Sequence, residues 1–487
     1  MTTVSEVVRA TTASDVVNPP NERARVVAIL PRGEAIRNFA HSGALDSMHA
    51  AADLTVLTVV PSPDVLAELT GRYGRVLPLP MSRDPYLVRI LRDLLDIAHG
   101  RQLWSVAAQE RWRLRDLEAD TPLKRIKRLG HKAAALPFAS RRGVVLLERI
   151  ERRLSRALSS SGSYRRLYRE IRPSLVFNGS HVHSHNAVGA VQTARWMGIP
   201  TVAFIFSWDN LTSQGRIIPE YDYYLVWNEA IAQQLREIYP HVEAERIVVT
   251  GTPQFDNHFR VQGRWSREEL CRQIGATPDR PFVLYSTGMA NHMRGEPSVV
   301  EQIADMLATM TDCSPPQLVV RVYPKDRSGR FNELKERRRD ILFPPAKWID
   351  AYLTPTEEDG ALLSALLRHA AVGVNIASTM SLELCMFDKP VVNVGYDPPD
   401  GTPVEVPFAR YYEYDHYKPL VASGAVSVAR TPDEMRQMIR EALTNPTRQR
   451  TQRTSLLRAL MGDTLDGRSG ERVASALLAL AARSTAQ

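Results

Sequence analysis

The sequence contains few residues that would cross-link it or carry it through a membrane. Only three of its 487 residues are cysteines, Cys271, Cys313 and Cys385. An odd number of widely separated cysteines excludes a disulfide framework and a cysteine-rich zinc site, so we expect a reducing, cytoplasmic environment. No run of 18 or more uncharged apolar residues occurs, which excludes a membrane-spanning helix. Residues 1–23 lack the apolar core of a secretory signal, and we predict a disordered tail there.

Acidic residues are scarce in one part of the chain. Residues 101–172 carry 19 Lys and Arg against 7 Asp and Glu, an excess of +12, although the whole protein has a net charge of only +8. This basic stretch has two interpretations, solvated helix faces or a surface that meets anionic lipid or an anionic carrier. Apolar residues such as Val144, Leu147 and Ile150 lie among the charges, as an interfacial helix requires. Nucleic acid is not expected as a partner, because aromatics are few and no base-reading motif is present.

Short apolar runs separated by helical segments occur in two series along the chain. A length of 487 residues is too great for one ordinary core, so two domains are expected. Unbroken apolar strands that alternate with helices indicate parallel sheets covered on both faces. The predicted strands are 26–30, 54–60, 174–177, 201–206, 223–227 and 247–250 in the first series, and 282–285, 318–322, 372–376 and 391–394 in the second.

The predicted fold class is α/β, with two Rossmann-like domains that face each other across a cleft. The first domain spans 24–255 and includes a basic helical insertion over about 85–172. A polar linker over 256–280 leads to the second domain at 281–460. A last helix over 461–487 is expected to pack back on the first domain. In such folds the ligand lies at the carboxyl ends of the strands.

In the second domain, polar loops follow three predicted strands. Ser378 and Thr379 open a helix, where free backbone N–H groups bind phosphate, and Glu383 is one and a half turns further on. The alternative is a simple helix cap. The other two loops supply a glycine turn and cations that suit a diphosphate, and their candidate residues are Ser286, Thr287, Gly288, Arg321, Tyr323 and Lys325.

In the first domain, the polar loops have a different character. His181, His183 and His185 alternate after a strand, and an imidazole there is a candidate general base; a metal site is the less favoured alternative. Trp208, Asp209 and Asn210 follow the next strand. They predict either a wall that holds a sugar ring or an Asx-type turn whose Trp fills the domain edge. Arg37 and Asn38 follow the first strand and are expected to line the same cleft.

Four segments make the sequence recognisable: 247–256 with its Gly251 turn, 321–326, the Ser378–Thr379 loop with 389–392, and 207–212. Together they resemble bacterial glycosyltransferases of the GT-B fold that build surface polysaccharides. They are also similar to CDP-glycerol glycerophosphotransferase-like proteins and to non-hydrolysing UDP-N-acetylglucosamine 2-epimerases. The chain departs from these patterns at Tyr323, which stands where the family has His, and in the Ser378–Thr379 loop, which lacks the paired glycines expected of an epimerase.

The resemblance implies a transferase that moves a sugar from a nucleotide-activated donor to a glycan or lipid-linked acceptor. The second domain would bind the donor, with the diphosphate on Ser378 and Thr379 and the ribose on Glu383. The first domain would bind the acceptor, with Asp209, His183 or His185 as the base if the reaction inverts. No metal or cofactor is expected. The protein would work in the cytoplasm, with the basic stretch as a peripheral attachment to the inner membrane face. A phosphotransferase, a UDP-sugar epimerase and a non-catalytic glycan-binding protein remain alternatives.

Overall fold

The computed structural model describes residues 23–485 apart from 61, 82–83, 183, 311–314 and 350–353. It divides into two compact units. Unit 1 contains the chain up to Asp256, a short piece near Ile349 and the C-terminal segment from Thr464. Unit 2 contains the remainder from Asn257 to Asp463. Residues 1–22 of the predicted tail over 1–23 lie outside the described residues, as does His183.

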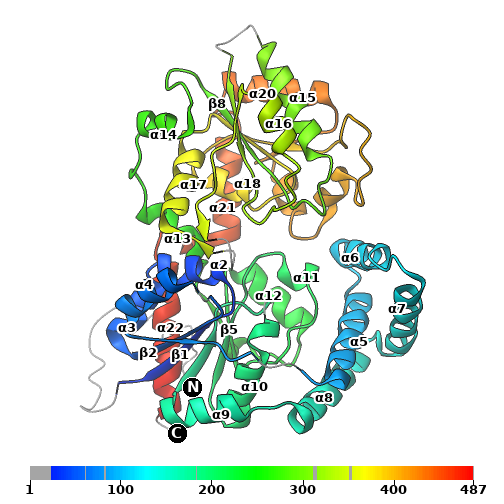
Figure 1. Ribbon diagram of the computed structural model, residues 1–487, viewed down its shortest axis with the longest axis vertical. Coiled ribbons are helices and arrows are strands. Elements are labelled where there is room, and N and C mark those ends of the chain that lie inside the picture. Colours follow the sequence, from blue (N-terminus) through cyan, green and yellow to red (C-terminus); the bar gives the residue numbers. More distant parts are fainter. Residues whose placement is uncertain are drawn as a thin grey trace. The chain divides into compact units, whose positions relative to one another are not determined.

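Unit 1 is built on a seven-stranded parallel sheet in the order β3-β2-β1-β4-β5-β6-β7 (Figure 1). Residues Val26 to Leu30 of β1, an interior strand of this sheet, are fully buried, as expected for a strand with helices on both faces. The strands are β1 (Arg25–Leu30), β2 (Asp53–Thr58), β3 (Arg75–Pro78), β4 (Leu175–Asn178), β5 (Thr201–Phe204), β6 (Tyr223–Val226) and β7 (Ile247–Val249).

The helices of unit 1 connect these strands and add a separate helical group. They are α2 (Gly33–Ile36), the π-helical turn η1 (Arg37–His41), α3 (Ala44–Ala51), α4 (Pro63–Tyr73), α9 (Gly162–Ile171), η3 (Ser184–Asn186), α10 (Val188–Trp196), α11 (Asn210–Ser213), α12 (Glu229–Ile238) and η4 (Ala244–Arg246). The separate group, here called the insertion, consists of α5 (Tyr86–Leu103), α6 (Val106–Leu117), α7 (Pro122–Ala135), η2 (Leu136–Phe138) and α8 (Arg141–Leu158). Figure 1 shows the insertion beside the sheet of unit 1.

Unit 2 has a six-stranded parallel sheet in the order β10-β9-β8-β13-β14-β15. The strands are β8 (Phe282–Ser286), β9 (Gln317–Arg321), β10 (Ile341–Leu342), β13 (Val372–Asn375), β14 (Val391–Val394) and β15 (Ser427–Ala429). The helices are α14 (Arg267–Ile274), α15 (Glu296–Ala308), α16 (Asn332–Arg337), α17 (Glu357–His369), α18 (Met380–Met386), η6 (Phe408–Glu413), α19 (Lys418–Ala422), α20 (Pro432–Thr444) and α21 (Arg450–Met461). Four short elements, α13 (Pro253–Arg260), β11 (Trp348–Ile349), β12 (Thr354–Pro355) and η7 (Gly462–Thr464), complete the chain before the last helix.

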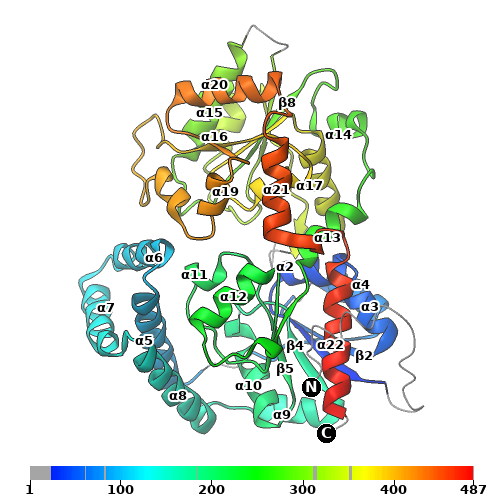
Figure 2. The same cartoon turned by 180° about the vertical axis from the view of Figure 1, so that it is seen from behind.

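The last helix, α22 (Ser469–Thr485), belongs to unit 1 and packs on α3 and β4 (Figure 2). It begins against the Gly251 turn. Gly251 has a φ of +79°, and a Cβ there would lie 2.4 Å from the hydroxyl oxygen of Ser469, so only glycine fits. The carboxylate of Asp256 accepts a hydrogen bond from the Gly470 N–H at 2.6 Å. The backbone of the helix start therefore approaches the turn after β7 closely.

The prediction of two doubly wound α/β domains is confirmed. All ten predicted strands are present within a few residues, whereas β3, β10, β11, β12 and β15 were missed. Each missed strand lies at an edge of its sheet, where half-exposed strands need no unbroken apolar run. Within the predicted linker 256–280, helix α14 buries Leu270, Cys271 and Ile274 in unit 2. Among the described residues, no helix is both long and apolar enough to cross a membrane.

Candidate functional site

The loops predicted to bind a diphosphate begin at one point of the unit 2 sheet. The chain winds outward from β8 through β9 to β10, and then in the other direction from β13 to β15, so the sheet reverses between β8 and β13. Ser286 pairs with Arg321 of β9 on one side and with Asn375 of β13 on the other. Doubly wound sheets bind their ligands outside the carboxyl ends of the strands at such a reversal. The three loops therefore share one edge.

Backbone and side-chain hydrogen bonds tie the loop after β8 to the loop after β9. The hydroxyl oxygen of Thr287 accepts a hydrogen bond from the Tyr323 N–H at 2.8 Å, and the Thr287 N–H donates to the Arg321 carbonyl at 3.1 Å. Ser286 and Thr287 are themselves buried. These contacts give the start of both loops a fixed shape.

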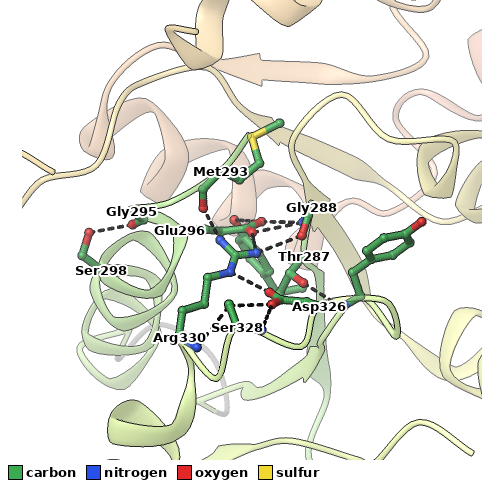
Figure 3. Close-up of polar contacts among 11 residues, drawn as sticks. Thr287, Gly288, Met293, Gly295, Glu296, Ser298, Asp326, Ser328 and Arg330 are labelled. Carbon is green, nitrogen blue, oxygen red and sulfur yellow. Dashed lines mark hydrogen bonds and ion pairs between the residues drawn. The ribbon is translucent and has the colours of Figure 1, made fainter. Parts of the chain in front are cut away.

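A buried carboxylate, Glu296, holds the far end of the loop after β8 (Figure 3). It accepts hydrogen bonds from the Gly288 N–H at 3.0 Å, the Tyr285 hydroxyl at 3.1 Å and the Arg330 guanidinium at 2.8 Å. Complete burial raises its pKa to about 7, because the charged form is poorly solvated there, while Arg330 opposes the shift. Glu296 is fully enclosed and therefore positions the loop.

Arg330 joins this cluster to the loop after β9. Its guanidinium bonds the Asp326 carboxylate at 2.7 Å and the Gly288 carbonyl oxygen at 2.8 Å, and it also reaches the carbonyl of Met293 (Figure 3). Asp326 and Arg330 are four residues apart in one loop, and Gly288 and Met293 belong to the other. One largely enclosed cation thus fixes two neighbouring loops at the carboxyl edge of the sheet.

The loop after β13 is held by a buried amide network. The side-chain oxygen of Asn375 accepts hydrogen bonds from the Ser378 N–H and from the Asn393 side chain, each at 3.0 Å. The Tyr417 hydroxyl donates to Asn393 at 2.9 Å. Ala377 has a φ of +41°, in the left-handed region that a residue with a Cβ rarely adopts. The network therefore maintains a strained turn directly before Ser378.

Ser378 and Thr379 lie half-buried at the start of α18, as the sequence predicts. The Ser378 hydroxyl oxygen accepts a hydrogen bond from the Met380 N–H at 3.2 Å. Glu383 is one turn into the helix, and its carboxylate bonds the ring Nε2 of His258 at 2.8 Å. Both side chains are largely buried. His258 is the nearest polar partner of the residue predicted to bind ribose.

The two predicted cations of the unit 2 site differ in environment. The Arg321 side chain is 5% exposed and pairs with buried Asp359 at 2.6 Å, which also accepts a hydrogen bond from the Trp348 indole. Arg321 therefore fastens α17 and residue 348 to the sheet in this structure. Lys325 is half-buried in the loop, with its ammonium 5.9 Å from the centre of the Tyr323 ring.

The sheet of unit 1 reverses in the same way, between β1 and β4. The loops that follow these strands are joined by a hydrogen bond of 3.0 Å from the Asn186 side chain to the Pro31 carbonyl. Arg37 and Asn38 lie in the π-helical turn after β1, where Arg37 donates to the Asn38 side chain at 3.0 Å and to Gln254 at 3.4 Å. Asn38 is fully buried, and its amide nitrogen has no hydrogen-bond partner among the described residues. Predicted acceptor residues thus flank this second reversal.

The histidines after β4 have separate environments. His181 is buried, and desolvation lowers its pKa to about 4, so it is a neutral part of the core beside the Phe204 carbonyl. His185 lies on the exposed side of the loop. Partial desolvation and the nearby positive charge of Arg32 lower its pKa, so the imidazole can accept a proton at neutral pH.

Residues 207–213 form a self-bonded turn. The Asn210 side chain accepts from the Ser207 N–H at 2.8 Å, and the Asp209 carboxylate accepts from the Ser213 hydroxyl at 2.7 Å. Trp208 is 9% exposed. The Asn210 side chain bonds a backbone N–H three residues earlier, whereas an Asx turn bonds one two residues later. The largely enclosed indole favours a structural role for the segment.

Solved structures share this architecture. UDP-GlcNAc 2-epimerase from Neisseria meningitidis bound to UDP-GlcNAc has a TM-score of 0.51 and 12% identity, covering 93% of this chain and 99% of that one. The MnaA–UDP structure from S. aureus has a TM-score of 0.50 and 11% identity, and the match covers 93% of this chain and 94% of that one. UDP-N-acetylglucosamine 2-epimerase from Rickettsia bellii has a TM-score of 0.51 and 10% identity, and the match covers 95% of this chain and 97% of that one. The chain has the GT-B fold. No protein-family model and no curated protein matches the sequence.

Sequence reasoning missed the residues that hold the loops. Glu296, Arg330 and His258 act through partners far along the chain, and pattern alone gives no signal for such pairs. The spacing of Asp326 and Arg330 by four residues was a local signal for their contact. Asn375 at the end of a buried strand was a second usable signal, because a buried amide needs partners.

Proposed function

We propose that this protein is a glycosyltransferase that moves a sugar from a nucleotide-activated donor to a glycan or lipid-linked acceptor in the synthesis of bacterial surface polysaccharide. The observation that supports it best is the convergence of the loops at 286–288, 323–325 and 378–379 on the reversal point between β8 and β13. Rigid loops at the reversal point of a parallel sheet, two of whose residues, Ser378 and Thr379, carry hydroxyl groups, suit a diphosphate. The similar structures with bound UDP-GlcNAc and UDP have the same fold.

The proposed donor site lies on unit 2. The diphosphate contacts the hydroxyl groups of Ser378 and Thr379 and the turn at Gly288. Lys325 offsets the negative charge that grows on the leaving group, so the proposal needs no metal ion. The carboxylate of Glu383 binds the ribose hydroxyls while His258 orients it from the other side.

The proposed chemistry exchanges one bond at the sugar. The bond between the anomeric carbon and the diphosphate oxygen breaks, and a bond from that carbon to an acceptor hydroxyl oxygen forms. The acceptor proton passes to a base, and a nucleoside diphosphate leaves. Of the candidate bases within the described residues, His185 combines an exposed loop position with a lowered pKa, whereas Asp209 already accepts a hydrogen bond from Ser213.

A UDP-sugar 2-epimerase is the second candidate, because the similar structures reported above are named as such enzymes or contain UDP. An epimerase needs no acceptor and releases no stoichiometric nucleoside diphosphate. At 10–12% identity the likeness concerns the fold, so the reaction must be decided by products.

The test is product analysis of the purified full chain with a panel of nucleotide sugars, with and without glycan or lipid-linked acceptors. The proposal predicts release of nucleoside diphosphate in an amount equal to the glycosylated acceptor, and negligible turnover without acceptor. Conversion of the sugar in the absence of acceptor would establish the epimerase instead. Release of a nucleoside monophosphate would establish a phosphotransferase.

Single substitutions test whether Glu383 binds the nucleotide itself or only supports the structure of the site. Glu383→Ala is expected to weaken nucleotide binding by about tenfold or more, since it removes a charged hydrogen-bond acceptor. His258→Ala removes the other half of the same pair and is expected to weaken binding less. Equal losses for the two variants, measured by calorimetry, would show that Glu383 acts only through the pair.

A further inference from the structure

Helix α7 presents its large apolar side chains to solvent and two of its basic side chains, Arg128 and Lys132, to the protein. Leu123, Ile126 and Leu129 are 77%, 69% and 68% exposed. At 3.6 residues per turn they lie on one face with Gly130 and Ala133. An ordinary surface helix has the reverse orientation, with its apolar stripe in the core. The outward stripe is therefore the unusual feature.

The contacts that attach α7 explain this orientation. Arg128 and Lys132 point inward, pair with Asp116 and lie over the Trp112 ring, 5.4 and 4.5 Å from its centre. Ala135 is fully buried in the core of the insertion. The helix is thus held by its polar side, and the Leu and Ile side chains have no role in that attachment.

Positive charge surrounds the apolar stripe. Lys124, Arg125 and Lys127 are exposed at its borders. Helix α7 itself contains no acidic residue, and Asp120, just before it, pairs with Lys124 at 2.7 Å. Over residues 122–158 the acids are Glu148 and Glu151. Both are buried, where Glu148 pairs with Arg216 and Glu151 with Arg92. The exposed residues of α7 and α8 therefore combine Leu and Ile with cations and include no acid.

The apolar residues that the sequence suggested for this surface are only partly correct. Val144 and Leu147 of α8 are buried in the core of the insertion and cannot face a partner. Leu146 and Ile150 are exposed beside Arg142, Arg149 and Arg153. The most exposed apolar residues of the basic stretch therefore lie on α7 rather than on α8. Figures 1 and 2 show α7 at the outer side of the insertion.

We infer that the α7 face is an attachment surface for an anionic lipid bilayer, into which Leu123, Ile126 and Leu129 insert while the flanking Lys and Arg bind lipid headgroups. Charge complementarity selects this occupant, since an anionic leaflet attracts cations and accepts apolar side chains together. A second copy of the same face would bring like charges together. The inference does not depend on the reaction proposed above.

The test is co-sedimentation of the full chain with vesicles of phosphatidylcholine containing about 30% phosphatidylglycerol, compared with phosphatidylcholine alone. Binding is expected to the anionic vesicles only, and to weaken as salt rises from about 0.1 to 0.5 M. Ile126→Asp is expected to lower the partition coefficient about tenfold or more. Met81→Asp, at a position 72% exposed outside α7, is the matched control and should change it little.

A second pair of variants tests the charges. The triple variant K124Q/R125Q/K127Q is expected to lower binding by about tenfold or more. R264Q/R272Q/R440Q removes the same charge from exposed positions of unit 2 and should leave binding within about twofold. Absence of binding to anionic vesicles at low salt, or equal losses in variants and controls, overturns the inference. The inference is also overturned if sedimentation velocity shows that this face binds a second copy of the chain, or an acidic protein, and that Ile126→Asp abolishes this binding.

Discussion

At the scale of the residue, Glu296 is the group on which the loop after β8 depends. Its carboxylate is completely buried and holds the Gly288 N–H, the Tyr285 hydroxyl and Arg330 at once. Burial raises its pKa to about 7, well above the value of about 4.5 expected in the unfolded chain. The folded state therefore binds this proton more tightly than the unfolded state does, and stability from this group falls as pH rises through 7.

The first prediction concerns this pH dependence. Between pH 5 and 7, ionisation of Glu296 is expected to cost the folded state about 2 kcal/mol relative to the unfolded state. Glu296→Gln cannot ionise and should lack this part of the decline, although it is less stable at low pH. Thermal unfolding of both proteins across this range measures it. Glu441→Gln, on the exposed side of α20, is the control and should follow the wild type.

The sequence identified the residues that begin each loop but not the residues that hold them. Ser286, Thr287, Ser378 and Thr379 were predictable because each follows a buried strand or opens a helix. The pairing of Glu383 with His258 joins residues 125 positions apart. The local sequence does not specify such a pair, since a hydrophobic pattern shows which face of an element is covered but not which residues cover it.

At the scale of the element, α18 is set directly on β13. A Cβ on Gly373 would lie 2.1 Å from a methyl carbon of Leu384, so glycine is required for this close packing. The approach fixes the helix whose first residues form part of the proposed diphosphate site. The edge strands β3, β10 and β15 are packed less closely. They could not be predicted from an apolar run, because they bury few side chains.

The second prediction is that Gly373→Ala lowers stability by about 1–3 kcal/mol and weakens nucleotide binding, because α18 must move outward. Thermal unfolding and calorimetry measure the two effects. The matched control is Gly71→Ala, at a position in α4 where a Cβ meets nothing within 4 Å. That substitution is expected to stabilise the helix by about 0.5–1 kcal/mol. Unchanged stability in Gly373→Ala would show that α18 is not tightly seated.

The insertion is attached to the rest of unit 1 by a buried ion pair. Arg216 and Glu148 of α8 are 3% and 9% exposed, with 2.9 Å between guanidinium and carboxylate, and the guanidinium lies 4.0 Å from the centre of the Tyr239 ring. Removal of one partner leaves the other charge buried without compensation.

The third prediction is that Arg216→Met destabilises unit 1 by about 3–5 kcal/mol and raises hydrogen exchange in α8. The double variant R216M/E148M should recover much of the loss, because no buried charge remains. Arg152→Met breaks the half-exposed pair with Glu220 and is expected to cost less than about 1 kcal/mol. A double variant no more stable than Arg216→Met would contradict this account of the attachment.

At the scale of the whole molecule, two doubly wound sheets each reverse direction once, and residues singled out from the sequence flank both reversals. The alternation of apolar strands and helices predicted this organisation because a parallel sheet must be covered on both faces. The insertion was recognisable by its charge, but the outward turn of α7 was not. The helix pattern shows that two faces differ, and only the contacts with Trp112 and Asp116 decide which one faces the protein.

The most direct test is a crystal structure of the protein soaked with nucleoside diphosphates of different bases. We expect the diphosphate outside the carboxyl ends of β8 and β13, within hydrogen-bond distance of the Ser378 and Thr379 hydroxyl groups and beside the Gly288 turn, with the ribose at Glu383. A nucleotide bound at another edge of either sheet would contradict it. Failure of every base to bind at saturating concentration would contradict it equally.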